Sequence, residues 1–91
     1  MKKYVIERDI PGVGSATAEC FCQATKQSNR ALDPLEGIQW IQSYVTANKL
    51  FCVYLADDED VIREHAETSG FPANRIHQVK TILDPTSANG F

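Results

Sequence analysis

The sequence predicts an α+β fold of the ferredoxin-like type, a sandwich in which two helices cover one face of an antiparallel four-stranded sheet. Strand-like and helix-like segments follow one another in the order β-α-β-β-α-β, which is the split βαβ plan. The two middle strands are joined by a short turn, as in an antiparallel hairpin. A length of 91 residues suits a single domain that spans residues 1–91.

The first two predicted elements are a strand and a helix. Residues 2–10 (KKYVIERDI) contain consecutive apolar residues that favour a strand, and the Pro-Gly pair that follows ends it. Residues 13–32 predict a helix with Ser15 as its N-cap. A loop, DPLEG, follows this helix at residues 33–37. The helix carries a weakly apolar stripe that consists of Ala18, Phe21, Thr25, Ser28 and Leu32.

The second half of the chain begins with the hairpin. Residues 38–45 and 50–56 predict its two strands, and the tight turn TANK joins them. The carboxylates of DDED suit the positive end of a second helix, which Gly70 ends in the left-handed conformation. Residues 74–84 predict the last strand, which a proline ends. We expect the tail, residues 86–91, to be loose or to pair with a sheet edge.

Both faces of the predicted hairpin are apolar. If Thr46 pairs with Lys49, Ser43 lies opposite Cys52, and alternate side chains point to opposite faces. One face then carries Ile41, Ser43, Val45, Leu50, Cys52 and Tyr54, and the other carries Trp40, Gln42, Tyr44, Phe51, Val53 and Leu55. Because the helices cover only one face, we expect a homodimer through the open sheet face. The alternative is a monomer whose C-terminal tail folds across that face.

Charge and hydropathy exclude several classes of partner. The net charge is −3, and the nine Lys and Arg residues form no run, which argues against nucleic-acid binding. No apolar run approaches the roughly 18 residues of a membrane span, and the N-terminus lacks the apolar region of a signal peptide. We therefore expect a cytoplasmic protein. The three cysteines form no C-x-x-C pair, which fits reduced thiols and argues against a zinc ribbon.

His65 is the first candidate for a functional residue. Helical spacing places it on the stripe that should face the sheet, together with Val61, Ile62, Ala66 and Ser69. A histidine in that position has two interpretations. It is either a core residue with hydrogen-bonded nitrogens, or a metal ligand or proton-transfer group in a pocket between helix and sheet.

Glu7 and Arg8 are neighbours near the end of the first strand, so their side chains point to opposite faces of the sheet. If Glu7 meets His65, the two form a carboxylate–imidazole pair that could orient the ring or hold a cation. Alternatively, both charges lie at the rim of the sheet, in water or in an intersubunit salt bridge.

Ser43, Cys52 and Tyr54 share one face of the hairpin and are candidate ligand-binding residues, together with Arg8. If that face lies under the helices, the side chain of His65 should point toward Ser43 and Cys52. A Cys–His pair could supply a nucleophile or metal ligands. The alternative is that the strand cysteine is inert core packing.

The remaining histidine and cysteines have weaker claims. His77 lies in the last strand beside Arg75 and Lys80, where a surface residue is the default. A metal site there would need a second ligand from a neighbouring strand or from across the dimer. Cys20 and Cys22 are roughly 200° apart around a helix, so an intact helix does not let them chelate one metal ion.

Several segments also suggest a family. YVIERDIPG, IQWIQSYVT, FCVYLA, IREHAETSGFPANRI and ILDPT resemble, in that order, a small bacterial family of ferredoxin-like, dimeric α+β-barrel proteins described as nickel-binding or of unknown function. The likeness runs from about Lys3 to Thr86. It implies a cytoplasmic homodimer with the βαββαβ fold and a divalent metal such as nickel.

Three functions follow as expectations. The first is a non-enzymatic homodimer that binds a divalent metal such as nickel, with His65, Glu7 and His77 as candidate ligands. The second is a small-molecule pocket protein or minor enzyme of the dimeric α+β-barrel type, with His65 and Glu7 as acid–base groups. The third is an interaction module without a ligand.

Overall fold

Six main elements follow one another in the predicted order β-α-β-β-α-β. They were located in a computed structural model that describes residues 1–90; Phe91, the last residue of the predicted tail, lies outside the described residues. The elements are β1 (Lys2–Asp9), α1 (Ala18–Leu32), β2 (Ile38–Val45), β3 (Lys49–Ala56), α2 (Glu59–Ser69) and β4 (Arg75–Gln78). Two short 3-10 helices are added, η1 (Val13–Ser15) before α1 and η2 (Pro85–Asn89) in the tail.

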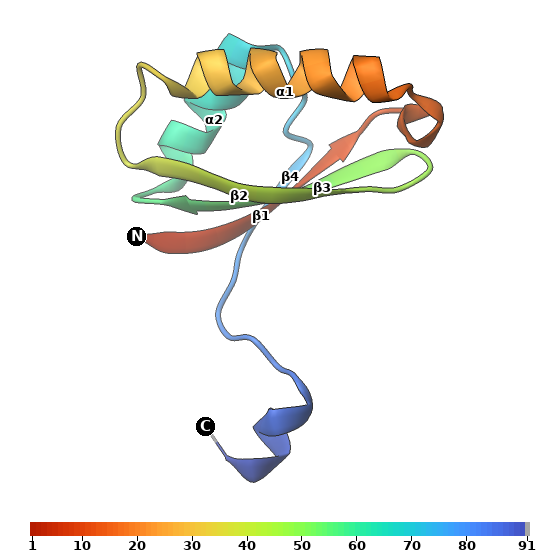
Figure 1. Cartoon of the computed structure of the whole chain (residues 1–91). Coiled ribbons are helices and arrows are strands. Elements are labelled where there is room, and N and C mark those ends of the chain that lie inside the picture. Colours follow the sequence, from red (N-terminus) through yellow and green to blue (C-terminus); the bar gives the residue numbers. More distant parts are fainter. Residues whose placement is uncertain (91) are drawn as a thin grey trace.

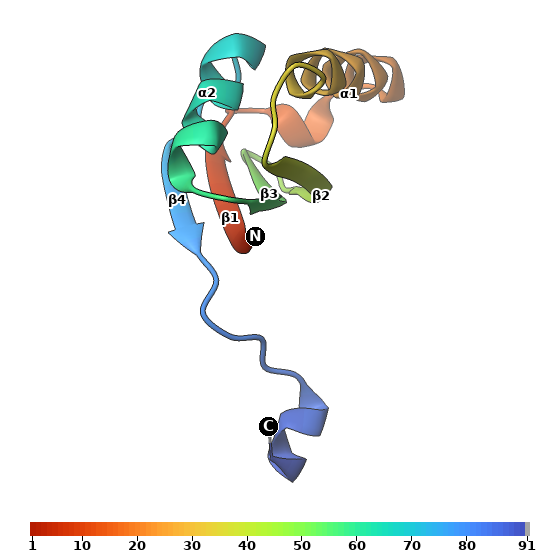
Figure 2. The same ribbon diagram turned by 90° about the vertical axis from the view of Figure 1, so that its left-hand side faces the viewer.

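The sheet has the strand order β2-β3-β1-β4, and every neighbouring pair is antiparallel. β1 is therefore a central strand that pairs with both β3 and β4. Both α1 and α2 lie on the same face of the sheet, and no helix of the described chain covers the other face (Figures 1 and 2). This arrangement is the predicted α+β architecture and is consistent with a ferredoxin-like fold.

The hairpin has the predicted register, with one irregularity. The Thr46 N–H donates to the Lys49 carbonyl over 2.9 Å, and Ser43 lies opposite Cys52. A β-bulge between Trp40 and Gln42 then shifts the register. Because a bulge inserts one extra residue, Trp40 pairs with Tyr54 and turns toward the helices. The prediction that Trp40 lies on the opposite face from Tyr54 was therefore wrong.

The start of α1 also differs from the prediction. Thr17, not Ser15, is the N-cap, and its hydroxyl accepts a hydrogen bond of 3.1 Å from the Cys20 N–H. Ser15 instead belongs to η1, which packs on the hairpin turn through the Gly14 N–H and the Ala47 carbonyl. The loop therefore forms η1 first, and α1 begins only after it.

β4 is much shorter than predicted. It spans Arg75–Gln78, whereas residues 74–84 were expected to form a strand. The reason is that β4 is antiparallel to β1 and reaches the first residues of the chain after only four residues. Gln78 lies opposite Tyr4, and the Val79 N–H donates to the Lys3 carbonyl. Beyond that point β1 has almost no residues left to pair.

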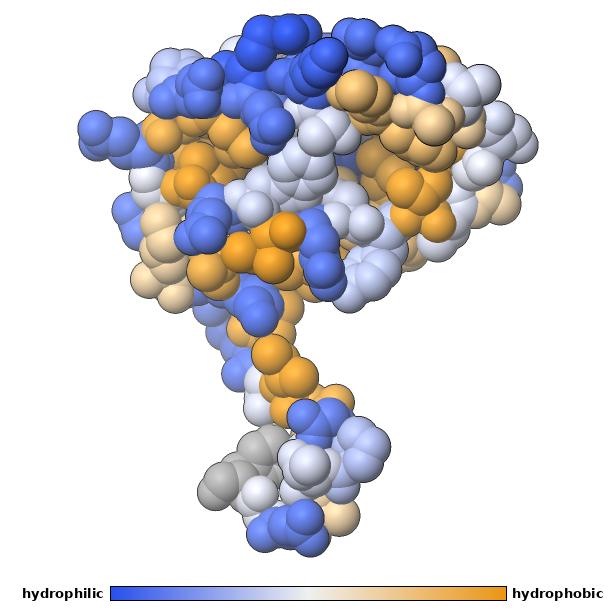
Figure 3. Space-filling view, viewed as in Figure 1, coloured by the Kyte–Doolittle hydropathy of each residue, from blue (hydrophilic) through white to orange (hydrophobic). Residues whose placement is uncertain are grey.

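The tail after β4 extends away from the sheet on the side opposite the helices (Figures 1 and 2). Within the described residues it neither pairs with a sheet edge nor folds across the open face. Ile82 and Leu83 are 61% and 71% exposed, and this apolar segment stands clear of the body (Figure 3). The radius of gyration of 14.3 Å exceeds the ~12 Å expected for a compact chain of this length because of this extension.

The core lies between α2 and the central strands. It comprises Tyr4 and Ile6 of β1, Cys52, Tyr54 and Ala56 of β3, and Ile62 of α2. α1 contributes much less, because only Ser28 and Ala31 of that helix are buried. α1 therefore lies over the β2–β3 half of the sheet without filling the space beneath it. No helix in residues 1–90 is long and apolar enough to cross a membrane.

We predict that Gly14→Ala destabilises the fold. A Cβ at this position would lie 2.8 Å from the Ala47 Cα and 2.8 Å from the Thr46 carbonyl oxygen, both of which are backbone atoms of the hairpin turn. Relieving such a clash should cost about 1–3 kcal/mol of the free energy of unfolding. Urea unfolding measures the change. Ser15→Ala, an exposed neighbour in η1, is the matched control and should leave the midpoint unchanged.

Candidate functional site

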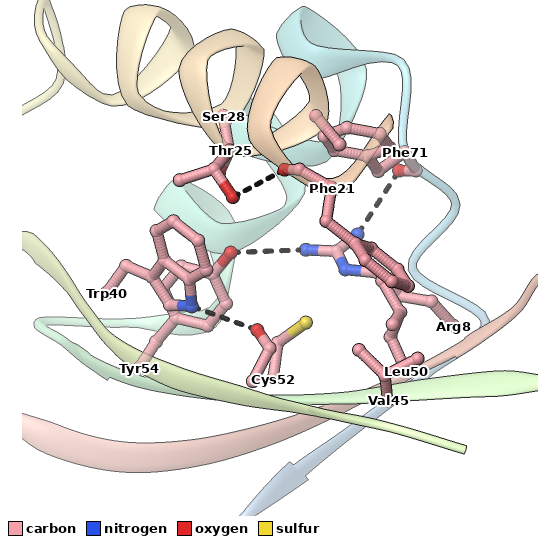
Figure 4. A pocket seen from close by; sticks show the side chains of 12 residues that line it. Arg8, Phe21, Thr25, Ser28, Trp40, Val45, Leu50, Cys52, Tyr54 and Phe71 are labelled. Carbon is pink, nitrogen blue, oxygen red and sulfur yellow. Dashed lines mark hydrogen bonds between the residues drawn. The ribbon is translucent and has the colours of Figure 1, made fainter. Parts of the chain in front are cut away.

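A cavity of about 210 Å³ lies between α1 and the sheet. It brings together all four predicted ligand-binding residues, Arg8, Ser43, Cys52 and Tyr54 (Figure 4). The remaining wall consists of the apolar or aromatic residues Phe21, Ala24, Trp40, Val45, Leu50 and Phe71 and of two hydroxyl residues, Thr25 and Ser28. The bulge in β2 contributes to this site, since it places Trp40 beside Tyr54.

Arg8 is the most unusual residue of the cavity. It is only 1% exposed. Its Nη1 donates to the Phe71 and Pro72 carbonyls over 3.2 and 2.8 Å, and its Nη2 donates to the Tyr54 hydroxyl over 3.4 Å. No ion pair among residues 1–90 involves this guanidinium. A buried cation is thus held by neutral acceptors alone, which is costly unless a counter-charge is added.

His65 faces inward from α2, as predicted, and is fully buried. Its Nε2 lies 3.3 Å from the Ser28 hydroxyl oxygen, and its ring is tilted against the Tyr54 ring with centroids 5.6 Å apart. Its Nδ1 has no hydrogen-bond partner in the described structure. Burial, and secondly the charge of Arg8, lower the pKa of His65, so the ring is held neutral.

His65 does not make the predicted contacts with Glu7 or Cys52. Glu7 lies on the open face of the sheet, because Ile6 and Arg8 on either side of it turn toward the helices. The hypothesis of a Glu7–His65 pair, one of the two alternatives for Glu7, is therefore wrong, because the two side chains lie on opposite faces of the sheet. No hydrogen bond between His65 and Cys52 exists in residues 1–90, and His65 is not part of the cavity wall.

Glu7 instead forms the centre of an open-face cluster, which consists of Glu7, Asp9, Lys49, Arg75 and His77. Its Oε2 accepts from Arg75 Nε over 2.8 Å and from Lys49 Nζ over 3.4 Å. Its Oε1 lies 3.1 Å from His77 Nε2. The hydrogen bond from Arg75 is the largest cause that lowers the pKa of Glu7 to about 2, with a smaller contribution from His77. Glu7 is therefore a carboxylate at every physiological pH.

The donor set for a metal ion is small. Within the described residues, no group of three or more His, Cys, Asp or Glu side chains could hold one. The best pair is the Oε1 of Glu7 with the Nε2 of His77, which lie on neighbouring strands. Among the described residues, Glu7 is thus the side chain on a neighbouring strand that contacts His77 Nε2. One chain therefore offers two ligands to a metal ion, and water or another chain must supply the remaining ligands.

The cysteines offer no further site. Cys20 and Cys22 are exposed on α1, and Cys52 is buried in the core. The hydroxyl of Thr17 lowers the pKa of Cys20 through a hydrogen bond. No disulfide joins any of the three.

Other residues that line the cavity or bind Arg8 were not predicted as site residues. Phe21 and Ser28 belong to the apolar stripe of α1, so their inward direction was visible in the sequence. The Phe71 and Pro72 carbonyls that bind Arg8 carried no such signal, because backbone acceptors have no residue preference.

We predict that the protein loses stability as the pH falls from 7.5 to 5. The pKa of His65 is lowered in the folded state, so below the ordinary value of 6.5 the unfolded chain binds a proton that the folded chain does not. The free energy of unfolding should fall by at most about 1.4 kcal/mol per pH unit. Thermal unfolding at several pH values measures this loss. His65→Gln should flatten the dependence, and His77→Gln, which leaves His65 in place, should retain it. A slope that survives in His65→Gln would refute the assignment.

Comparison with known proteins places the chain in a family. A family model described as "Nickel responsive protein SCO4226-like" matches residues 4–79. The crystal structure of SCO4226 from Streptomyces coelicolor A3(2) is similar with a TM-score of 0.75, over 89% of this chain and 99% of that one, at 15% sequence identity. At this identity the likeness shows a shared fold. No curated protein matches the chain. Because the family model covers most of its length, the chain belongs to the SCO4226-like family of nickel responsive proteins.

Proposed function

We propose that the protein is a single-domain, cytoplasmic homodimer that binds a divalent cation such as nickel through Glu7 and His77. One observation carries the proposal: Oε1 of Glu7 and Nε2 of His77 lie 3.1 Å apart on a sheet face that no helix of residues 1–90 covers. The family's description as nickel responsive supports the choice of metal. The three free thiols suit a reducing compartment.

The chemistry of the two donors suits nickel. Imidazole nitrogen binds Ni²⁺ well, and a carboxylate oxygen adds negative charge. Arg75 and Lys49 both bind the Oε2 of Glu7, which leaves Oε1 as the oxygen that is turned to His77. A cation would therefore replace the Glu7–His77 hydrogen bond and leave the ion pairs of Oε2 in place. The two nearby cationic groups weaken such a site, so further ligands are needed.

A second copy of the chain is the natural source of those ligands. The open face carries Val5, Phe51, Val53 and Leu55 in neighbouring strands, next to the exposed ring of Tyr44. Such a face favours burial against a partner over contact with water. In a two-fold symmetric dimer each copy presents the same surface, so a second Glu7–His77 pair enters the same interface.

An enzyme with His65 and Glu7 as acid–base groups has less support. The two side chains lie on opposite faces of the sheet, so no proton can pass between them within one chain. The pocket-protein alternative keeps a physical basis in the cavity under α1.

We predict saturable nickel binding that depends on His77. Calorimetric titration of tag-free protein with NiCl₂ should give a saturable isotherm. His77→Ala should weaken binding at least tenfold, equivalent to about 1.4 kcal/mol, because it removes the only imidazole of the pair. Gln78→Ala, the next residue of the same strand, is the matched control and should bind as the wild type does. No saturable uptake by the wild type, or unchanged affinity in His77→Ala, would contradict the proposal.

We also predict a dimer that is disrupted from the open face. Light scattering at micromolar concentration should give twice the 10.1 kDa mass of one chain. Val53→Lys should shift the mass to that of a monomer, because it places a charge in the buried centre of the interface. Gln23→Lys, on the exposed side of α1, should remain dimeric. A monomeric wild type would overturn this prediction.

A further inference from the structure

We propose that the cavity between α1 and the sheet binds a small organic monocarboxylate, with its carboxylate against Arg8 and its apolar body against Trp40, Phe21 and Leu50. This site lies on the helix-covered side of the sheet and shares no residue with the Glu7–His77 pair. The two proposals can therefore fail independently.

The charge of Arg8 is the first argument. The residue is 1% exposed, lines the cavity, and belongs to no ion pair formed by residues 1–90. A guanidinium matches a carboxylate in shape and charge, and such charge-assisted hydrogen bonds are stronger than those to carbonyl groups. The bound anion would supply the counter-charge that the described chain does not.

The unequal use of the two terminal nitrogens of Arg8, Nη1 and Nη2, is the second argument. Nη1 is occupied by two backbone carbonyls, at 3.2 and 2.8 Å. Among the described residues, Nη2 has only a long contact of 3.4 Å to the Tyr54 hydroxyl, and both groups point into the cavity (Figure 4). Burial raises the pKa of Tyr54, so its hydroxyl stays protonated and can donate. A carboxylate placed here could accept from Nη2 and from the Tyr54 hydroxyl together.

The rest of the wall defines the body of the ligand. The polar groups near the aromatic side chains are already satisfied, since Trp40 Nε1 donates to the Ser43 hydroxyl over 3.0 Å and the Thr25 hydroxyl donates to the Phe21 carbonyl over 2.8 Å. What remains is apolar and aromatic surface, which favours an aromatic or aliphatic body.

The volume of the cavity and the charge of its wall narrow the class of ligand further. The cavity volume of about 210 Å³ is below the roughly 300–1,000 Å³ of pockets for drug-sized ligands, so the acid is small. A doubly charged phosphate would need several free donors, whereas Nη1 of Arg8 is occupied by two backbone carbonyls and the walls are largely apolar. The site therefore favours a single carboxylate over phosphate.

The test uses 3-phenylpropionate as the probe and 3-phenylpropionamide as its neutral counterpart. Trp40 is the only tryptophan of the chain and lines the cavity, so its fluorescence reports occupancy. We expect saturable quenching or enhancement by the carboxylate, in the absence of added metal, with at least tenfold weaker binding of the amide. Inorganic phosphate should not compete.

Two variants test separately the charge of Arg8 and the space in the cavity. Arg8→Gln should reduce the affinity for the carboxylate at least tenfold and remove the preference over the amide. Because this change could disturb folding, Ala24→Phe, which fills the cavity from α1 and keeps Arg8, should also abolish binding. Gln23→Phe, on the exposed side of the same helix, is its matched control and should bind normally.

Three results would overturn the proposal. They are no saturable change in the folded wild type, equal affinity for the carboxylate and the amide, and displacement of the probe by phosphate. If the wild type binds the carboxylate but does not bind nickel, the metal proposal alone is refuted.

Discussion

The side-chain alternation of β1 is the constraint on which both candidate sites depend. This strand lies between β3 and β4, so each of its side chains must enter either the helix layer or the open face. Ile6 and Arg8 enter the helix layer, and Glu7 between them enters the open face. Two adjacent opposite charges are thereby separated by the thickness of the sheet, and each must find its own partners. Glu7 pairs with two cations and an imidazole, whereas Arg8 has only neutral acceptors among residues 1–90.

The neutral acceptors of Arg8 depend on how α2 ends. Gly70 adopts the left-handed conformation with φ 79°, which stops the helix and turns the chain back toward the sheet. The next two carbonyls, of Phe71 and Pro72, then point at the guanidinium. Arg8 thus fixes the connection between α2 and β4. The same contact holds the guanidinium in place before any ligand arrives, which lowers the entropic cost of binding.

Much of this fold was predictable because its signals are local. The element order, the register of the hairpin and the inward direction of His65 follow from periodicity and turn residues. The bulge at Trp40 and the short β4 were not predictable, because each depends on a partner strand. The opposite directions of Glu7 and Arg8 were also expected, but alternation alone does not say which face the helices cover. That choice decided whether His65 would lie on the same side of the sheet as Glu7 or as Arg8.

The proposed metal site needs more ligands than a single chain supplies. One copy offers two donors, and Arg75 and Lys49 already neutralise the carboxylate of Glu7. A cation that approaches Glu7 therefore meets electrostatic opposition, which only a strong imidazole bond and additional ligands can offset. A second copy across the open face would add a second imidazole and a second carboxylate while it excludes water. On this view metal binding and dimerisation depend on the same surface, so each should strengthen the other.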